Sequence, residues 1–210
     1  MIAALMLVGG YLLGSIPSGL IVSRVYRGVD VRDQGSGKTG FTNTLRSLGL
    51  GAAVIVLVAD VVKGAIPVLI ARAVFDDPWA ATLTGVAAVI GHTFPVFANF
   101  RGGRGVATAF GALLAIALWP SLWLALVVLV AGGAALAITR YVSVMSMTAA
   151  AVAFVLIVIS VAVGWLAPHY LLFGGAATLA IELNHLPNMR RLLRGVEPKL
   201  GQGGASSAGS

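Results

Sequence analysis

A short stretch near the N-terminus, Gly35 to Gly40, combines three glycines with one lysine and two hydroxyl side chains. It looks like the end of a nucleotide-binding P-loop, which needs a first glycine five positions before the second and a preceding strand. Position 32 is Arg32, and the residues before it are charged and interrupted by Gly28. Spacing and context therefore argue against a nucleotide site. Closely spaced glycines still expose backbone N–H groups, which favours binding of a phosphorylated ligand.

The polar cluster continues beyond these glycines. Thr42 and Arg46 are four positions apart and would share one face of a helix, with Asn43 beside them. A glycine loop that only ends a membrane helix is the alternative. The density of polar side chains next to a helix N-terminus, a favourable position for anions, supports phosphate binding instead.

A second cluster extends from Gly91 to Gly111. Arg101 and Arg104 flank two glycines, and guanidinium groups bind phosphate through paired hydrogen bonds. Basic residues beside a membrane helix would explain the two arginines but not the glycines. His92 could serve as a general base, a phosphate donor or a packed ring, and we favour a structural or positioning role over the base.

Other polar residues stand within or beside apolar stretches. Asp60 and Lys63, three apart, form either a functional site or a structural ion pair. Ser143 opens a later apolar stretch, where a serine often bonds only to its own helix. His185 and Asn188, also three apart, precede a basic end that could lie on anionic lipid. With three histidines, no cysteine and seven acids, the sequence forms no metal-binding constellation, and no cofactor is expected.

Membrane helices must position these side chains. Hydrophobic residues make up 59% of the chain and charged residues 10%, against about 25% charged residues in soluble domains. Most apolar stretches approach the ~20 residues that span a bilayer. The stretches are 2–23, 48–71, 79–98, 105–118, 121–139, 142–164 and 165–183. We expect one membrane domain over residues 1–200 and a disordered Gly/Ser-rich tail over 201–210.

The distribution of basic residues indicates the topology. A proline in Trp119–Ser121 either kinks one long helix or marks a turn between two. With a turn there are seven transmembrane helices, and twelve of the fourteen basic residues, all but Arg72 and Lys63, share one side. The positive-inside rule then predicts an all-α polytopic membrane protein with its N-terminus outside and its C-terminus in the cytoplasm.

Taken together, the clusters resemble one family, the integral-membrane acyl-phosphate–glycerol-3-phosphate acyltransferases of the PlsY type. The motifs GSIPSG, GSGKTGFTN, DVVKG, GHTFPVFANFRGGRGVAT, RYVS and NMRRLLRGVEPK follow the family's order across nearly the whole chain. The resemblance implies acyl transfer from acyl phosphate to the sn-1 hydroxyl of glycerol 3-phosphate, giving lysophosphatidate and inorganic phosphate. This is the first acylation of phospholipid biosynthesis, at the cytoplasmic face of the bacterial inner membrane. The resemblance also implies a soluble partner enzyme that supplies acyl phosphate.

The resemblance also implies the site residues. The catalytic set is His92, Arg104, Ser143, His185 and Asn188. The substrate-binding set is Ser36, Gly37, Thr42, Asn43, Arg46, Arg101, Gly102 and Gly103. The chain departs from the family pattern at Lys38 and Phe41, at Arg101 and Arg104 in place of lysines, and at Asn184 and Leu186 beside His185. The proton of the attacking hydroxyl goes to His92, to His185 or to the leaving phosphate.

A membrane transporter or channel for a phosphorylated anion is the competing hypothesis. It would share the basic mouth but would need polar residues that continue across the membrane, and the apolar stretches offer few. A phosphotransferase acting on CDP-alcohols would need a cluster of metal-binding aspartates, which is missing from the sequence. Despite a net charge of +7, no nucleic-acid partner is expected, because the basic residues gather in loops beside membrane helices.

Overall fold

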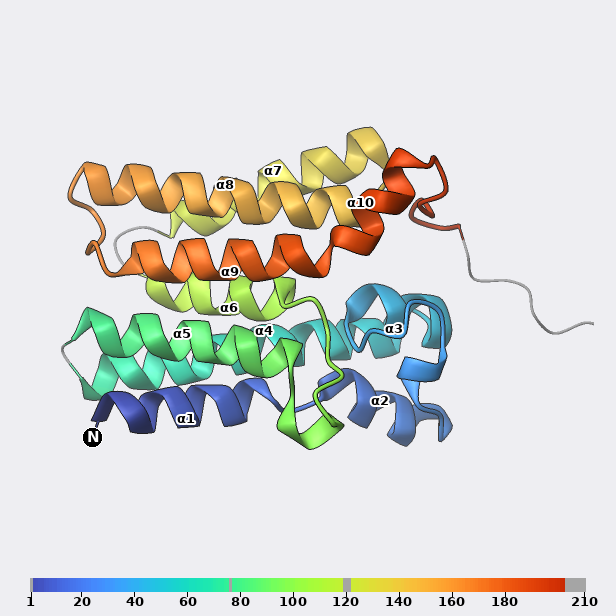
Figure 1. Cartoon of the computed structure of the whole chain (residues 1–210), viewed down its shortest axis with the longest axis horizontal. Coiled ribbons are helices and arrows are strands. Elements are labelled where there is room, and N and C mark those ends of the chain that lie inside the picture. The colour runs from blue at the N-terminus through green and yellow to red at the C-terminus, as the bar shows by residue number, and fades with distance from the viewer. Residues whose placement is uncertain (1, 76, 119–121, 203–210) are drawn as a thin grey trace, which may run out of the picture.

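The protein is a bundle whose long helices lie nearly parallel to one another (Figure 1). The computed structural model describes residues 2–75, 77–118 and 122–202, and within these ranges it contains helices and no strand. In chain order the elements are α1 (Ile2–Gly14), α2 (Ser18–Arg27), η1 (Val31–Asp33), α3 (Phe41–Leu48), α4 (Leu50–Val74), α5 (Pro78–Thr93), η2 (Val96–Ala98), α6 (Val106–Ile116), α7 (Trp123–Thr139), α8 (Val142–Ala162), α9 (Tyr170–Asn184) and α10 (Leu186–Leu193). The predicted all-α class is confirmed.

The seven expected apolar stretches each contain one apolar helix. Four helical segments are long and apolar enough to cross a bilayer, namely Ala4–Arg27, Leu50–Val74, Pro78–Ala98 and Val142–Ala162. Helices α6, α7 and α9 are apolar but have 11, 17 and 15 residues. The count of seven spans therefore stays a prediction. Of the expected tail, only residues 201 and 202 are described.

The first apolar stretch, 2–23, is interrupted between α1 and α2. The chain leaves the helix there because Pro17 has no backbone N–H and restricts the residue before it. The Lys63 Nζ on α4 donates to the freed Ile16 carbonyl at 2.7 Å. The interruption is thus held in place from a neighbouring helix.

Helices α6 and α7 are separate and run in opposite directions (Figure 1). The Trp119–Ser121 segment, where a kink or a turn was expected, lies outside the described residues. On α4, the Arg72 guanidinium donates to the last carbonyls of α6, those of Ala115 and Ile116. Arg72 therefore supplies hydrogen-bond donors to carbonyl groups at the C-terminus of α6, which have no partner within the helix.

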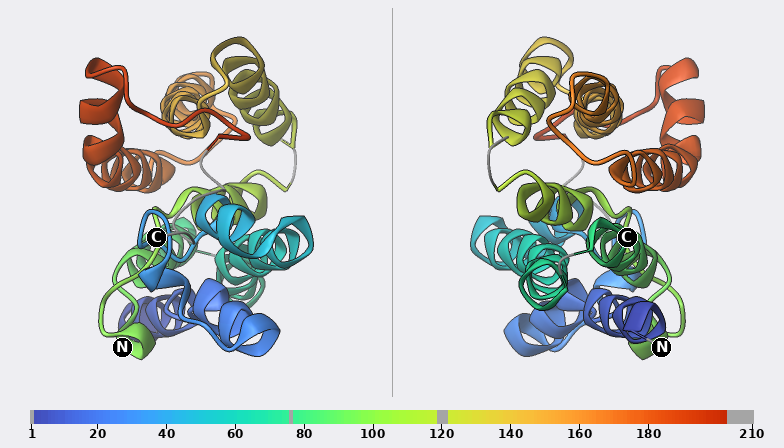
Figure 2. Two further views of the ribbon diagram at one scale, coloured as in Figure 1. Left: turned by 90° about the vertical axis from the view of Figure 1, so that its right-hand side faces the viewer. Right: turned by 90° about the vertical axis from the view of Figure 1, so that its left-hand side faces the viewer.

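The bundle has two groups of helices with α6 between them (Figure 2). One group contains α1 to α5, and the other contains α7 to α10. Large apolar side chains are exposed on the outer faces of both groups, as expected where lipid would cover them. Examples are Ile55 and Val58 on α4, Leu126 and Val130 on α7, and Val155 and Ile159 on α8.

Glycines allow close approach between α4 and α6 and between α1 and α5. A Cβ at Gly64 on α4 would collide with the Thr108 carbonyl oxygen on α6, and one at Gly111 would collide with that of Val61. Between α1 and α5, Gly14 meets the backbone of Ala88 in the same way. Small residues at such crossings are typical of membrane helices, whose association depends on close packing.

We expect Gly64→Val to push α4 away from α6 and to lower the free energy of unfolding by about 1–3 kcal/mol, the usual cost of overpacking. Thermal unfolding of the purified protein in detergent measures this. The control is Gly9→Val on α1, because nothing lies within 4 Å of a Cβ at Gly9. Equal melting temperatures for the two variants would contradict the close crossing of α4 and α6.

Candidate active site

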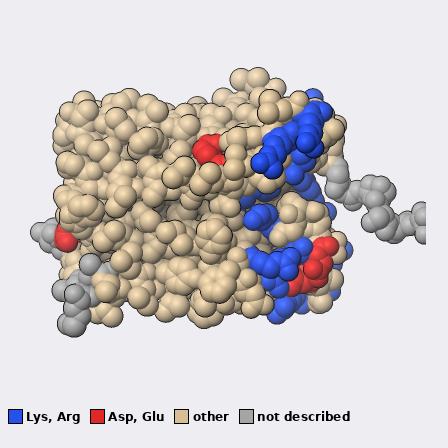
Figure 3. All heavy atoms as spheres, in the orientation of Figure 1, with Lys and Arg blue, Asp and Glu red and all other residues tan. Residues whose placement is uncertain are grey.

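The basic residues gather at one end of the bundle. Figure 3 shows them on one face, over the end that carries α2, α3 and α10. The α1–α4, α5–α6 and α7–α8 connections and the segment after α9 all lie at this end (Figure 1). We call it the basic end. The short helices and connections at this end carry twelve of the fourteen basic residues in the sequence.

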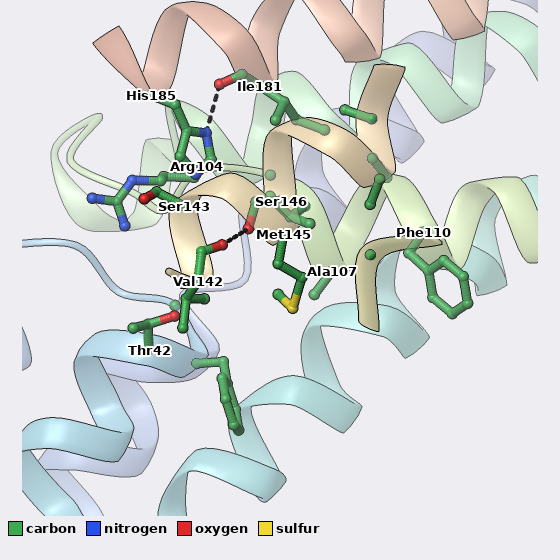
Figure 4. A pocket seen from close by; sticks show the side chains of 18 of the residues that line it. Thr42, Arg104, Ala107, Phe110, Val142, Ser143, Met145, Ser146, Ile181 and His185 are labelled. Atoms are coloured by element: carbon green, nitrogen blue, oxygen red, sulfur yellow. Dashed lines mark hydrogen bonds between the residues drawn. The ribbon is translucent and has the colours of Figure 1, made fainter. Parts of the chain in front are cut away.

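A cavity of about 390 Å³ extends from the basic end into the bundle, between the two groups of helices. Polar side chains from α3 and from the helix ends line its mouth, and apolar residues of α6, α7, α8 and α9 line its interior. Figure 4 shows Arg104, Ser143 and His185 grouped at the mouth, with Phe110 farther along the cavity. The cavity therefore joins a polar compartment to an apolar one.

Cationic side chains crowd the mouth. Burial lowers the pKa of Arg104, and the charges of Arg191 and Arg46 lower it further, while Glu197 opposes them. Burial and the charge of Arg104 also lower the pKa of Lys38. Among the described residues, the buried Nε of Arg104 has no hydrogen-bond partner. Mutually repelling cations with an unpaired guanidinium donor form a site that a bound anion would stabilise.

Other buried polar atoms of the cavity lining also make no hydrogen bond of good geometry to the residues that the structure describes. Ser143 Oγ and Asn188 Oδ1 are two of them. The Asn188 side chain is oriented by Glu197, which accepts from Asn188 Nδ2 at 2.6 Å and from Arg191 Nε at 2.7 Å. Burial would raise the pKa of Glu197, but Asn188, the nearby Ser143 hydroxyl and Arg191 outweigh it and lower the pKa.

Glu197 was not among the predicted site residues. Its signal in the sequence is a single acid within a strongly basic segment, between Arg194 and Lys199. The structure explains why an acid stands at this position. The Glu197 carboxylate accepts a hydrogen bond from Asn188 and neutralises part of the positive charge at the mouth.

His185 is buried at the junction of α9 and α10, where it lines the cavity. Its Nδ1 lies 2.8 Å from the Ile181 carbonyl oxygen. A carbonyl only accepts, so Nδ1 carries the proton and Nε2 keeps its lone pair. Burial, together with the charges of Arg104 and Lys38, lowers the pKa of His185 to about 4, against the opposing effects of the Ile181 carbonyl and Glu197. The ring is therefore a neutral hydrogen-bond acceptor at pH 7.

His92 is held on several sides. Its Nδ1 lies 3.5 Å from Asp60 Oδ1, which is also 2.8 Å from Lys63 Nζ. A Cβ at Gly103 would collide with His92 Nε2, and the Gly103 N–H donates to the His92 carbonyl at 3.1 Å. His92 thus fixes the loop that precedes Arg104, which agrees with a positioning role.

The glycine loop before α3 is organised by Asn43. Its Oδ1 accepts from the Ser36 N–H at 2.9 Å, and its Nδ2 donates to the carbonyls of Val31 and Lys38, both at 2.8 Å. Gly37 has φ 68°, a backbone conformation that favours glycine. The side-chain amide of Asn43 therefore shapes this loop.

The cavity brings together eight of the thirteen predicted site residues. Thr42, Asn43, Arg46, His92, Arg104, Ser143, His185 and Asn188 line it. Ser36, Gly37, Arg101, Gly102 and Gly103 do not, and Ser36 and Arg101 are exposed. The unusual residues Lys38 and Phe41 also line the cavity, whereas the Asn184 side chain donates to the Ala180 carbonyl of its own helix. Within the described ranges, no cluster of three metal-ligating side chains occurs.

The chain is similar to known proteins over nearly all of its length. A family model described as glycerol-3-phosphate acyltransferase matches residues 4–195. Relatives named glycerol-3-phosphate acyltransferase include one from Parasynechococcus marenigrum, 41% identical over 200 residues, which cover 95% of this chain and 91% of the relative. Another, from Thermus thermophilus, is 44% identical over 199 residues, which cover 91% and 92% of the two chains.

Two crystal structures of PlsY, an integral membrane glycerol 3-phosphate acyltransferase, are similar to the whole bundle. The glycerol 3-phosphate form matches with a TM-score of 0.85 and the lysophosphatidic acid form with 0.83. Each is 38% identical in sequence, and each match covers 94% of both chains. The order of motifs, the fold and the sequence identity agree, and the chain belongs to the glycerol-3-phosphate acyltransferase family.

Proposed function

We propose that this protein transfers an acyl group from acyl phosphate to the sn-1 hydroxyl of glycerol 3-phosphate, giving lysophosphatidate and inorganic phosphate. The observation that carries the proposal is the cavity, whose mouth is cationic and whose interior is apolar. Both substrates carry phosphate, and the donor and the product carry a long chain. A transporter is less well supported, because the described lining of the cavity becomes apolar away from the basic end.

Arg104, Arg46 and Lys38 bind the phosphate groups in this proposal. Arg46 and Thr42 lie one turn apart on α3 and both line the cavity. The glycine loop, with Ser36 and Gly37, acts through the shape that Asn43 gives it. Gly102 and Gly103 act through the close approach of their loop to His92, which sets the position of Arg104.

The reaction needs neither a covalent nucleophile nor a metal, because acyl phosphate is an activated mixed anhydride. The glycerol hydroxyl oxygen bonds to the acyl carbon, and the bond from that carbon to the phosphate oxygen breaks. Arg104 stabilises the charge of the departing phosphate, and Ser143 Oγ donates to the oxygen that becomes negative on the acyl carbon. Asn188 Oδ1, free of other partners in the described structure, accepts from a glycerol hydroxyl.

His185 is the proton acceptor that the geometry favours over His92. Its Nε2 is free to accept, whereas His92 is held between Asp60 and Gly103. Bound phosphates neutralise the Arg104 and Lys38 charges that lower the pKa of His185, so substrate binding makes Nε2 more basic. The proton then passes to the leaving phosphate, and His185 returns to its neutral form.

We propose that the basic end faces the cytoplasm of a bacterial cell, with the inner membrane around seven helices. The positive-inside rule supports this orientation. Acyl phosphate would come from a soluble enzyme at the same face. A reporter fused after Lys199 should be active only in the cytoplasm, and activity outside the cell would refute the orientation.

The direct test is incubation of the purified protein with acyl phosphate and glycerol 3-phosphate. Lysophosphatidate and inorganic phosphate should appear in equal amounts. A parallel reaction with acyl-CoA tests the class of donor. Formation of lysophosphatidate with acyl-CoA as donor, but not with acyl phosphate, would overturn the acyl-phosphate proposal.

Arg104→Ala should lower kcat/KM by about 30-fold to several thousand-fold, because losing a buried charge contact costs about 2–5 kcal/mol. Arg104→Lys keeps the charge without the paired donors and should be intermediate. Arg101→Ala is the matched control, since Arg101 is exposed and outside the cavity, and we expect it to stay within about fivefold of the parent. Equal losses for Arg104→Ala and Arg101→Ala would contradict the role of Arg104.

The His185 imidazole should titrate near pH 4 in the free protein, because burial and nearby cations lower its pKa. It is protonated and unable to accept below that pH, and neutral above it. Adding glycerol 3-phosphate should raise the midpoint. NMR of histidine-labelled protein in micelles measures this, with His185→Gln to assign the signal. A titration midpoint near pH 6.5 in the absence of substrate would contradict this prediction.

A further inference from the structure

The cavity ends at one large residue on each of four helices. Leu113 on α6, Val128 on α7, Ile157 on α8 and Phe173 on α9 are the lining residues farthest from the basic end. They are 3%, 4%, 0% and 2% exposed. Farther along, the buried side chains of Ile116, Leu124 and Tyr170 belong to the same apolar core. We call the four large residues the floor of the cavity.

Between the mouth and the floor, the lining of α7, α8 and α9 contains many small residues. They include Gly132 on α7, Ala149 and Ala153 on α8, and Gly174 and Ala177 on α9. A Cβ at Gly174 would lie 2.9 Å from Phe154 and 3.0 Å from Ile157, so this glycine lets α9 pack closely on α8 beside the floor. The change from small to large side chains marks where the open space stops.

The depth of this space can be read along the helices. From Ser143 at the mouth to Ile157 at the floor, α8 advances fourteen residues, which is about 21 Å at about 1.5 Å per residue. From His185 to Phe173 the distance is twelve residues, or about 18 Å. An extended saturated chain advances about 1.3 Å per carbon, so the space matches roughly 14 to 16 carbons.

We infer that the floor, formed by Leu113, Val128, Ile157 and Phe173, limits the length of the acyl chain that the enzyme accepts. The inference rests on the proposed acyl transfer. A chain with its carbonyl beside Ser143 places its terminal methyl group against the floor at about 16 carbons. Each methylene that stays outside the cavity does not contribute the roughly fourfold gain in affinity that burial of a methylene gives. The depth of the cavity therefore selects against longer chains.

Ala153→Leu tests the inference by raising the floor. Ala153 lines the cavity ten residues from Ser143, a depth of about 15 Å or roughly 12 carbons. The ratio of kcat/KM for 16-carbon to 12-carbon acyl phosphate should fall by at least about tenfold. Ala151→Leu is the control, because Ala151 is exposed on the same helix and does not line the cavity. An unchanged ratio in Ala153→Leu would overturn the inference.

Ile157→Ala tests it in the opposite direction by deepening the cavity. The ratio of kcat/KM for 18-carbon to 16-carbon acyl phosphate should rise by about tenfold. Ile116→Ala is the control, since it also truncates a buried isoleucine but lies outside the cavity lining. The same rise in both variants would attribute the effect to general loosening and would overturn the inference.

A second readout separates this inference from the proposed function. The increase in melting temperature caused by lysophosphatidates of 12, 16 and 18 carbons is measured for each variant, without any acyl donor. If the parent protein makes no lysophosphatidate from acyl phosphate, the donor proposal fails, while shifted lysophosphatidate preferences still support the floor. If the parent is active and neither variant shifts either readout, the floor is refuted and the donor proposal stands.

Discussion

The buried carboxylate of Asp60 is the group through which the helices of the first group control the site. It pairs with Lys63 on its own helix and lies beside His92 on α5. Lys63 holds the Ile16 carbonyl where the chain breaks between α1 and α2, and His92 packs on Gly103. An ion pair inside a membrane protein is costly, so its partners must be placed accurately. Here that placement fixes both the helix break and the loop that carries Arg104.

The site attracts anions because the cationic side chains at its mouth are partly buried. Arg104, Lys38 and Arg46 surround a mouth where only Glu197 and Asp60 supply negative charge among the lining residues that the structure describes. Burial and mutual repulsion lower the pKa of Arg104 and Lys38. A phosphate group relieves that repulsion, so the arrangement is most stable when an anion is bound. Apolar space directly beside the cations then suits a ligand with a charged head and a long chain.

The two histidines of the cavity differ in a way that their sequence neighbourhoods do not reveal. His92 follows a membrane helix and precedes the arginine motif, which makes it the more conspicuous candidate in the sequence. In the fold it supports a loop, and the free nitrogen belongs to His185. Asn43 likewise has a role that its sequence position does not reveal. Its side-chain amide looks suited to ligand binding, but it forms hydrogen bonds that shape the glycine loop.

The sequence alone was sufficient for the all-helical class, for the family and for the gathering of basic residues at one end. Each of these depends on properties that accumulate along the chain: apolar stretches, charges in the loops between them, and the order of short motifs. The break at Pro17, the role of Glu197, the free Nε2 of His185 and the floor at Ile157 and Phe173 were decided by the tertiary structure. Burial, hydrogen-bond partners and the depth of a cavity arise from contacts between residues far apart in the chain, and no local pattern records those contacts.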